Sequence, residues 1–539
     1  MTSISRAGRI VPALLSAAAL TAPLMSYAQQ HQRDREIHDT DTLAWWHTTE
    51  ALSNDAMEGR DTGSPAYQRA ADYVANRFKA AGLAPAGENG GYFQPVPMHE
   101  MAVVPDGTGF TLIGANGAET PLKFLQQISI SPTENLSEKL EAPLVFRGYC
   151  GKDAMTEVAG KIVVCFGTQR DGLPNGTARA ANARDGKALG LINVDDPYFS
   201  IEPPRWPYAY ARSVSLRTSQ AAQPGQLAQP GKPQPAPLAG MRLSAEAFVT
   251  LLAGSGQDAA ALLKLGGAKQ PLPSFEIPGK LRVQLHVTQR DISSPNVIAK
   301  LAGTDAALKA EHVVIAAHLD GYGFGTPVNG DNLYNGTLDD AAYVALLIQA
   351  ADDLKARRLK APRRSILFIA FTGEEKGLLG SRWFVDHPTV PAAALVADVN
   401  LDQLRPLFPL NILTAEALSD TSLGETARAV AAPMHIEIRA DAEPERNLLF
   451  RADQYPFLTI HVPAISFIFG YDPNTDAEKR YREWYQVRYH RPQDDLGQPM
   501  DFAAAAKFNT FFYRLVQTIA NDSHRPAIYS SSSFSANKH

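Results

Sequence analysis

The sequence is poor in cysteine and has no large excess of charge of either sign. Its two cysteines, Cys150 and Cys165, permit one disulfide at most and exclude a disulfide scaffold. The 51 Lys and Arg residues against 56 Asp and Glu residues give a net charge of −5, so no basic excess points to nucleic acid or an anionic membrane. Glycine and proline are near average usage, which excludes collagen-like or low-complexity character. What remains is a mildly acidic, globular chain of 539 residues, long enough for several domains.

Residues 1–28 have the pattern of a cleaved secretory signal peptide. Arg6 and Arg9 form a positive start, residues 10–25 carry no charge, and Ser26-Tyr27-Ala28 fits a small-x-small cleavage site. No later stretch is long and apolar enough to cross a bilayer. We therefore expect a secreted or periplasmic protein whose mature chain does not span a membrane. An oxidising destination would permit a bridge between the two cysteines, although their spacing does not prove one.

The pattern after residue 295 predicts an α/β domain. Short apolar runs alternate with amphipathic segments, which predicts strands at 313–317, 365–371, 394–401 and 463–469, and helices at 340–354 and 502–519. Such alternation is typical of a mostly parallel central sheet with helices on both faces.

The sequence pattern divides the mature chain into four parts. Residues 29–124 are predicted as the first part of this domain, 125–285 as a β-rich insert, 286–525 as the main part, and 526–539 as a flexible tail.

Polar clusters follow the predicted strands, where ligands gather in sheets of this kind. The clusters are His318-Leu319-Asp320, Glu374-Glu375 and Asn400-Leu401-Asp402 at strand ends, Asp339-Asp340 at a helix start, and Tyr489-His490 with Asp494 near the C-terminus. Each cluster alone is weak evidence for a functional site. Together they are stronger evidence, because most of them fall at strand ends or at a helix start of one domain.

Zinc chemistry explains the set. Zn²⁺ binds imidazole nitrogen and carboxylate oxygen, and two neighbouring ions need a bridging carboxylate. Two histidines, three carboxylates and one hydroxide would bring the charge around two zinc ions to zero. Asp320 is expected to bind the other imidazole nitrogen of His318, and Asp494 either to do the same for His490 or to cap a turn.

The order of these motifs resembles that of the co-catalytic di-zinc aminopeptidases, a family that also holds glutamate carboxypeptidase and the glutaminyl cyclases. The most specific motif is the run from Glu374 to Ser381, which reads Glu-Glu-Lys-Gly-Leu-Leu-Gly-Ser. The segments at 158–164 and 188–192 make the insert resemble a protease-associated domain. The resemblance implies the zinc exopeptidase fold and two Zn²⁺ ions per chain.

The resemblance also implies a role for each matching residue. His318 and Asp402 would hold one zinc, Glu375 and His490 the other, and Asp339 would bridge them. Glu374 would be the general base that takes a proton from the attacking water. Tyr489 matches a tyrosine that steadies the oxyanion in some relatives, with core packing as the alternative, and Arg451 is a candidate for attracting a substrate carboxylate.

Three segments depart from the family pattern. Ala342-Tyr343 stands where a Ser-Gly pair is usual, and Gln403 where Met is usual. Residues 451–454 read Arg-Ala-Asp-Gln rather than Arg-Ser-Asp-His. These changes spare the metal ligands and put substrate specificity in doubt.

The sequence therefore predicts a secreted zinc aminopeptidase that acts on peptides. A carboxypeptidase, a dipeptidase or a glutaminyl cyclase on the same site remains an alternative, as does a non-catalytic binding protein, although the complete ligand set argues against the last. A serine hydrolase is disfavoured because the sequence has no Gly-x-Ser-x-Gly motif. The sequence does not indicate the oligomeric state.

Overall fold

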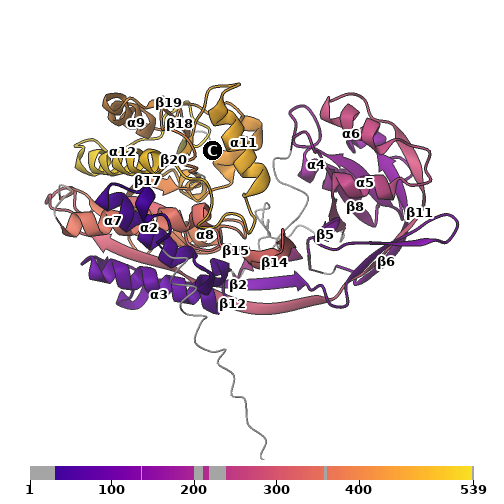
Figure 1. Ribbon diagram of the computed structural model, residues 1–539, viewed down its shortest axis with the longest axis horizontal. Coiled ribbons are helices and arrows are strands. Elements are labelled where there is room, and N and C mark those ends of the chain that lie inside the picture. The colour runs from indigo at the N-terminus through magenta and orange to yellow at the C-terminus, as the bar shows by residue number, and fades with distance from the viewer. Residues whose placement is uncertain are drawn as a thin grey trace, which may run out of the picture.

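The computed structural model describes residues 31–134, 136–199, 211–217, 238–356, 361–402 and 404–536. The predicted signal peptide and Gln403 lie outside these residues. Two large sheets, each with its own apolar core, form the two halves of the molecule (Figure 1). Within the described ranges, no helix combines the length and apolar character that a bilayer span requires.

The larger sheet has ten strands. They are β1 (Ala84–Pro85), β2 (Phe93–Val103), β9 (Arg212–Leu216), β12 (Val287–Leu301), β13 (His312–His318), β16 (Ser365–Phe371), β17 (Leu395–Leu401), β18 (Ile412–Glu416), β19 (Glu437–Arg439) and β20 (Ala464–Phe469). Their order is β19-β18-β20-β17-β13-β16-β12-β2-β9, with β1 beside β12.

This sheet is mixed rather than mostly parallel, which corrects the prediction. Strands β16, β13, β17 and β20 are parallel neighbours, whereas β12 is antiparallel to both β16 and β2, and β9 is antiparallel to β2. The direction of the early strands is set by the long β2–β12 ladder, a pairing between distant segments that local periodicity does not reveal. The four strands predicted after residue 295 are all present, as β13, β16, β17 and β20.

Helices cover both faces of the larger sheet, as predicted. They are α2 (Thr40–Ser53), α3 (Pro65–Ala80), α7 (Ala342–Lys355), α8 (Leu379–Asp386), α9 (Leu423–Ala431), α10 (Gln454–Thr459), α11 (Asp476–Val487) and α12 (Phe502–Asn521). Successive residues of β13 point to opposite faces, so Val313 and Ile315 join one core and Val314 and Ala316 the other. Residues from α2, α3, α7 and α12 belong to the first core and residues from α8 and α10 to the second.

The smaller sheet has eight strands in the order β4-β3-β11-β6-β7-β8-β10-β5. These are β3 (Gly109–Ile113), β4 (Glu119–Leu122), β5 (Ile128–Ile130), β6 (Lys139–Arg147), β7 (Ile162–Gly167), β8 (Gly190–Asp195), β10 (Ala239–Leu243) and β11 (Ser274–Gln284), with helices α4 (Gly176–Asp185), α5 (Ala245–Leu251) and α6 (Ala259–Gly267). Strands β3 and β4 precede residue 125, and β9 pairs with the larger sheet. The two sheets therefore divide the chain differently from the predicted insert range 125–285.

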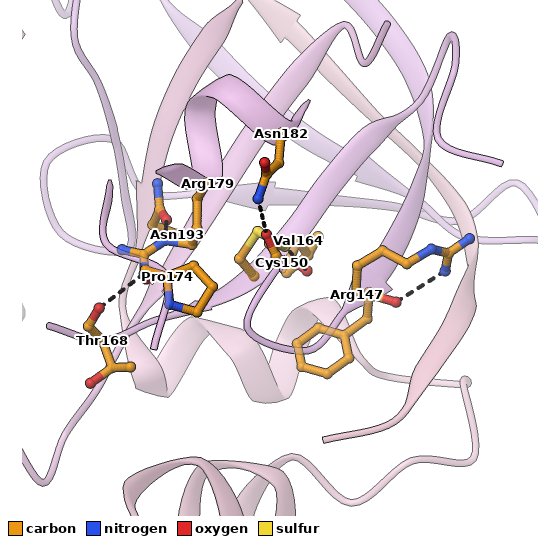
Figure 2. Close-up of a disulfide and its surroundings, with 10 residues drawn as sticks. Arg147, Cys150, Val164, Thr168, Pro174, Arg179, Asn182 and Asn193 are labelled. Carbon is orange, nitrogen blue, oxygen red and sulfur yellow. Dashed lines mark hydrogen bonds between the residues drawn. A yellow bond between two sulfur atoms is a disulfide. The ribbon is translucent and has the colours of Figure 1, made fainter. Parts of the chain in front are cut away.

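A disulfide joins Cys150 to Cys165 (Figure 2). Cys165 lies in β7 and Cys150 in the turn after β6, and both are fully buried. The backbone carbonyl of Cys150 accepts a hydrogen bond of 3.0 Å from the side chain of Asn182 in α4 (Figure 2). The bridge thus ties the turn to the strand, and the hydrogen bond ties the turn to the helix.

The described residues within the predicted tail, 526–536, contact the larger half. Ile528 pairs with Thr421, and the backbone N–H of Tyr529 donates to the carbonyl of Asp420 at 2.8 Å. Ser532 donates to the Asp420 carboxylate at 2.6 Å. These contacts order a segment that its composition alone does not distinguish from a flexible tail.

Candidate metal centre

Three neighbouring parallel strands bring their polar ends together. His318 is the last residue of β13, Glu374 and Glu375 follow β16, and Asp402 follows β17. Because these strands are paired in parallel register, their carboxyl ends meet at one edge of the sheet.

Two more predicted ligands reach this edge from other elements. Asp339 lies in the helical turn Thr337–Ala341 that precedes α7, and His490 lies shortly after α11. The structure therefore brings together all five residues to which the family resemblance assigns a metal.

The five residues form two groups that share Asp339. Ligand atoms of His318, Asp339 and Asp402 all lie within 4.8 Å of one another, as do those of Asp339, Glu375 and His490. Asp339 Oδ1 lies 3.4 Å from His318 Nε2, and Asp339 Oδ2 lies 3.5 Å from His490 Nε2. Ligands 2.0–2.1 Å from a tetrahedral zinc lie about 3.3 Å apart. One carboxylate thus presents a different oxygen to each group, as a bridging ligand does.

Unsatisfied buried atoms show that the residues fit a metal. His318 Nε2, Asp339 Oδ2 and Glu375 Oε1 are buried and have no hydrogen-bond partner. Leaving such atoms unpaired is unfavourable by about 1–3 kcal/mol for each group. Imidazole nitrogen and carboxylate oxygen are the donors that zinc takes, so bound zinc ions would supply the missing partners.

Glu374 lies beside these two groups. Its Oε2 is 4.0 Å from His318 Nε2, and Glu374 is itself close enough to His318 and Glu375 to form a further ligand group. Burial raises the pKa of Glu374 well above its usual value; His318 opposes this shift, and Asp402 and Glu375 add to it. Burial raises the pKa of Glu375 to about 7. Glu374 is therefore placed to accept a proton beside the centre, and Glu375 is placed to bind a metal ion.

Asp320 does not act as predicted. The Nδ1 of His318 lies 3.1 Å from the backbone carbonyl oxygen of Asp320 and 3.8 Å from its carboxylate. The carboxylate instead accepts hydrogen bonds from the backbone N–H of Glu374 at 3.0 Å and from Thr62 Oγ1 at 2.8 Å. The chain turns after β13, so the carbonyl rather than the side chain meets the imidazole. Asp320 thereby positions Glu374.

Asp494 holds the turn that carries Asp339. Its carboxylate accepts hydrogen bonds from the backbone N–H groups of Leu338 at 2.9 Å and Asp339 at 3.1 Å, and from Gln498 at 2.6 Å. Burial raises its pKa to about 6, with Asp339 adding to the effect. Of the two predicted roles, the turn cap is the one that these contacts support.

Arg60 is a structural determinant that the sequence reasoning missed. Its side chain is fully buried and donates to the backbone carbonyls of four residues: Leu52, Leu319, Asn335 and Gly336. Burial lowers its pKa to about 10. The residue therefore joins the end of α2, the turn after β13 and the segment that leads to Asp339.

A second buried arginine contacts the bridging carboxylate. Arg405 donates to the carbonyls of Leu338 and Leu404, and its Nη2 lies 3.7 Å from Asp339 Oδ1. Its guanidinium stacks on Trp484 at 4.4 Å from the ring centroid. Burial opposes ionisation of Asp339, but Arg405 and the two histidines hold the pKa of Asp339 well below its usual range.

Two tyrosines flank His490. The Tyr489 ring stacks on the imidazole with centroids 3.6 Å apart, and the Tyr489 hydroxyl accepts a hydrogen bond of 3.2 Å from Arg451 Nη2. On the other side, the Tyr322 hydroxyl lies 3.1 Å from His490 Nδ1. Tyr322 directly precedes the short strand β14 (Gly323–Val328).

A cavity of about 1140 Å³ connects the centre to the smaller sheet. Glu375, Lys376, Arg451 and Tyr489 line one side, and residues at the ends of β8 and β10, among them Asp195 and Arg242, line the other. A ligand at the metal centre therefore faces both halves of the molecule.

Comparisons with known proteins agree with this architecture. Residues 296–516 match the model of "Peptidase family M28". A "Probable zinc metalloprotease" of Pyrenophora tritici-repentis is 24% identical over 263 residues, which cover 42% of this chain and 56% of that protein. The chain thus spans about half the length of this curated relative.

Two solved structures are similar over most of their length. An aminopeptidase from Aneurinibacillus sp. strain AM-1 is 18% identical with a TM-score of 0.58, and the zinc aminopeptidase BSAP from Bacillus subtilis is 19% identical with a TM-score of 0.56. Each alignment covers 92% of this chain and 97% of the other. At this identity the likeness establishes the fold.

Proposed function

We propose that this chain, whose residues 296–516 match the model of peptidase family M28, is a zinc-dependent exopeptidase that removes amino-terminal residues from peptides. One observation carries the proposal. The carboxylate of Asp339 presents separate oxygens to His318 and to His490 at 3.4 and 3.5 Å, which is the arrangement that a pair of metal ions requires.

Each residue of the centre has a role in this proposal. His318, Asp339 and Asp402 would hold one zinc, and Asp339, Glu375 and His490 the other. Bound zinc supplies a nucleophile at neutral pH and polarises the scissile carbonyl.

Three further side chains would handle protons and orientation. Glu374 would accept the proton of the attacking water, because its carboxylate lies beside the centre and Asp320 holds its backbone. Tyr489 would donate a hydrogen bond to the developing oxyanion, and Arg451 would orient that hydroxyl.

Charge supports an amino-terminal preference. The centre concentrates the carboxylates of Asp339, Glu374, Glu375 and Asp402, all of which are mostly buried. A protonated α-amine placed among them would gain charge-assisted hydrogen bonds. Carboxypeptidase action is the second candidate, because Arg451 lines the same cavity and a guanidinium binds carboxylates well.

We also propose that the protein is exported and acts in the periplasm or outside the cell. The signal-like segment at residues 1–28 motivates this, and the Cys150–Cys165 disulfide supports it, since such bonds persist in oxidising compartments.

The test compares leucine p-nitroanilide with its N-acetyl form and with a peptide blocked at its carboxyl end. Acetylation removes the amine charge and leaves buried carboxylate oxygens unpaired, so kcat/KM should fall by roughly 10- to 100-fold. The carboxyl block should change little. Equal cleavage of the acetylated compound, or loss of activity only on carboxyl blocking, would reject the aminopeptidase assignment.

A further inference from the structure

A second cluster of metal-binding side chains lies away from the catalytic centre. His31 and Asp34 lie at the start of the described chain, and His47 and Glu50 lie on α2. Ligand atoms of His31, Asp34 and His47 all lie within 4.8 Å of one another. His47 and Glu50 are three positions apart, so they project from the same face of the helix.

The ligand atoms of His31, Asp34 and His47 lie close enough together to hold one ion. Asp34 Oδ1 lies 2.9 Å from His47 Nε2 and 3.8 Å from His31 Nδ1. Glu50 Oε2 lies 3.0 Å from His31 Nδ1. Tetrahedral zinc ligands lie about 3.3 Å apart, and the distances from Asp34 Oδ1 to the two imidazoles bracket this value.

Glu50 is the feature that separates this cluster from an ordinary surface ion pair. Its side chain is only 4% exposed, whereas those of His31, Asp34 and His47 are 35–39% exposed. Its Oε1 accepts a hydrogen bond of 2.9 Å from the backbone N–H of His31, while its Oε2 is buried, has no hydrogen bond and faces the His31 imidazole. A buried carboxylate oxygen of this kind needs a positive partner.

The His31 imidazole, 3.0 Å away, supplies a positive charge to this oxygen only when the imidazole is protonated. In the described part of the chain, no Lys or Arg pairs with Asp34 or Glu50. The neighbouring Arg33 is engaged elsewhere, because it pairs with Glu36 and stacks on Trp46 and Phe502. A divalent cation would balance the two carboxylates.

We propose that His31, Asp34 and His47 form a separate binding site for a divalent transition-metal ion, with zinc as the representative ion, and that Glu50 holds the His31 imidazole in place. Two imidazoles and one carboxylate suit zinc and related transition metals and are unsuited to Mg²⁺ or Ca²⁺, which take oxygen ligands. The bound ion would fasten the segment that carries His31 and Asp34 to α2. This inference is independent of the proposed function, since none of the four residues belongs to the catalytic centre.

Zinc content tests the site directly. The full-length protein and its variants are saturated with zinc, desalted to remove weakly held ions, and analysed for zinc per chain by elemental analysis. We expect His47→Ala to hold about one zinc equivalent less than the unmodified protein. Glu50→Gln keeps the size and the hydrogen bond from His31 but loses the charge, and we expect it to lose most of the same equivalent.

A matched control and a second readout make the result decisive. His38→Ala removes an exposed histidine close in sequence but outside the cluster, and it should keep the full zinc content. Circular dichroism verifies that each variant is folded, and hydrolysis of leucine p-nitroanilide should be equal in all of them. Equal zinc in the unmodified protein, His47→Ala and Glu50→Gln would overturn the proposal and leave the cluster as a set of ion pairs.

Discussion

In both halves of the molecule, neighbouring parallel strands bring polar residues together at their carboxyl ends, but these residues are paired differently in the two halves. In the larger half, the parallel strands β13 and β16 lead into residues whose buried polar atoms lack hydrogen-bond partners, namely His318 Nε2 and Glu375 Oε1. In the smaller half, the parallel strands β7, β8 and β10 end facing the same cavity. There, Arg242 pairs with Asp195 at 2.5 Å, and the next residue, Asp196, accepts hydrogen bonds from Thr168 and Arg170.

The difference shows that parallel strands bring polar residues together at their ends, but that the strand arrangement alone does not determine whether those residues bind one another or a ligand. Where a gathered carboxylate is paired with a cation, as Asp195 is with Arg242, the groups form a wall. Where they remain unsatisfied, as His318 and Glu375 do, they are prepared for an external partner. We therefore assign the chemistry to the larger half and the shaping of the cavity to the smaller one.

The largest expected effect comes from the proposed proton acceptor. Glu374→Gln keeps the size of the side chain but removes the acceptor, so kcat should fall by about 10²–10⁴-fold while zinc stays bound. Glu375→Gln is the matched control, because it should lose zinc instead. Steady-state kinetics with zinc analysis checks both variants, and the reverse pattern would mean that the two glutamates exchange roles.

The next effect concerns the scaffold of the larger half. Arg60→Met would leave four buried backbone carbonyls without a donor, and we expect the free energy of unfolding to fall by at least about 3 kcal/mol. Arg69→Met removes an arginine that is 45% exposed. This variant should change the free energy of unfolding by less than about 0.5 kcal/mol. Urea unfolding measures both. Similar losses in the two variants would contradict the role of Arg60.

A smaller effect tests whether an unsatisfied carboxylate away from the metal centre destabilises the protein. Glu416 is 6% exposed and its Oε1 has no hydrogen bond; burial raises its pKa to about 7, with Asp441 adding to the effect. In the unfolded state Glu416 loses its proton near pH 4.5, whereas in the folded state it keeps the proton up to about pH 7. The contribution of the protonated side chain to stability is therefore lost as the pH rises from about 4.5 to about 7.

The variant Glu416→Gln removes this dependence. At pH 8 its free energy of unfolding should exceed that of the unmodified protein by about 1–3 kcal/mol, and near pH 4 the two should be similar. Glu483→Gln, at an exposed position, should show no such pH-dependent difference. Unfolding curves at both pH values measure this, and a gain that does not depend on pH would refute the explanation.

The smallest effect belongs to the wall of the smaller half. Arg242→Ala should leave zinc content and the hydrolysis of leucine p-nitroanilide unchanged, because Arg242 lies across the cavity from the centre. For a tetrapeptide that extends toward the wall, KM should rise by up to about 10-fold. Arg282→Ala, in an exposed ion pair of the same half, is the control. Loss of zinc in Arg242→Ala would contradict the division of labour between the halves.

The sequence predicts those features that depend on local pattern. The strands β13, β16, β17 and β20 follow from short apolar runs, and His318, Glu375 and Asp402 stand where those runs end. The family resemblance adds Asp339 and His490, which the turn before α7 and the segment after α11 bring to the same place.

Features that depend on distant pairing could not be predicted. Arg60 binds backbone carbonyls, which carry no sequence signal, and some lie more than 250 positions away. Asp320 is misassigned because a two-residue spacing does not reveal whether a carbonyl or a carboxylate meets the imidazole. The mixed direction of the sheet depends in the same way on the ladder between β2 and β12.

The central claim is that Asp339 is shared by two metal groups, and zinc content measures it most directly. Elemental analysis of zinc-saturated, desalted Asp339→Ala and Asp402→Ala should show a loss of about two equivalents in the first variant and about one in the second, each relative to the unmodified protein. Each zinc loses a charged ligand in Asp339→Ala, whereas only one does in Asp402→Ala. If Asp339→Ala keeps as much zinc as Asp402→Ala, the bridging assignment is wrong.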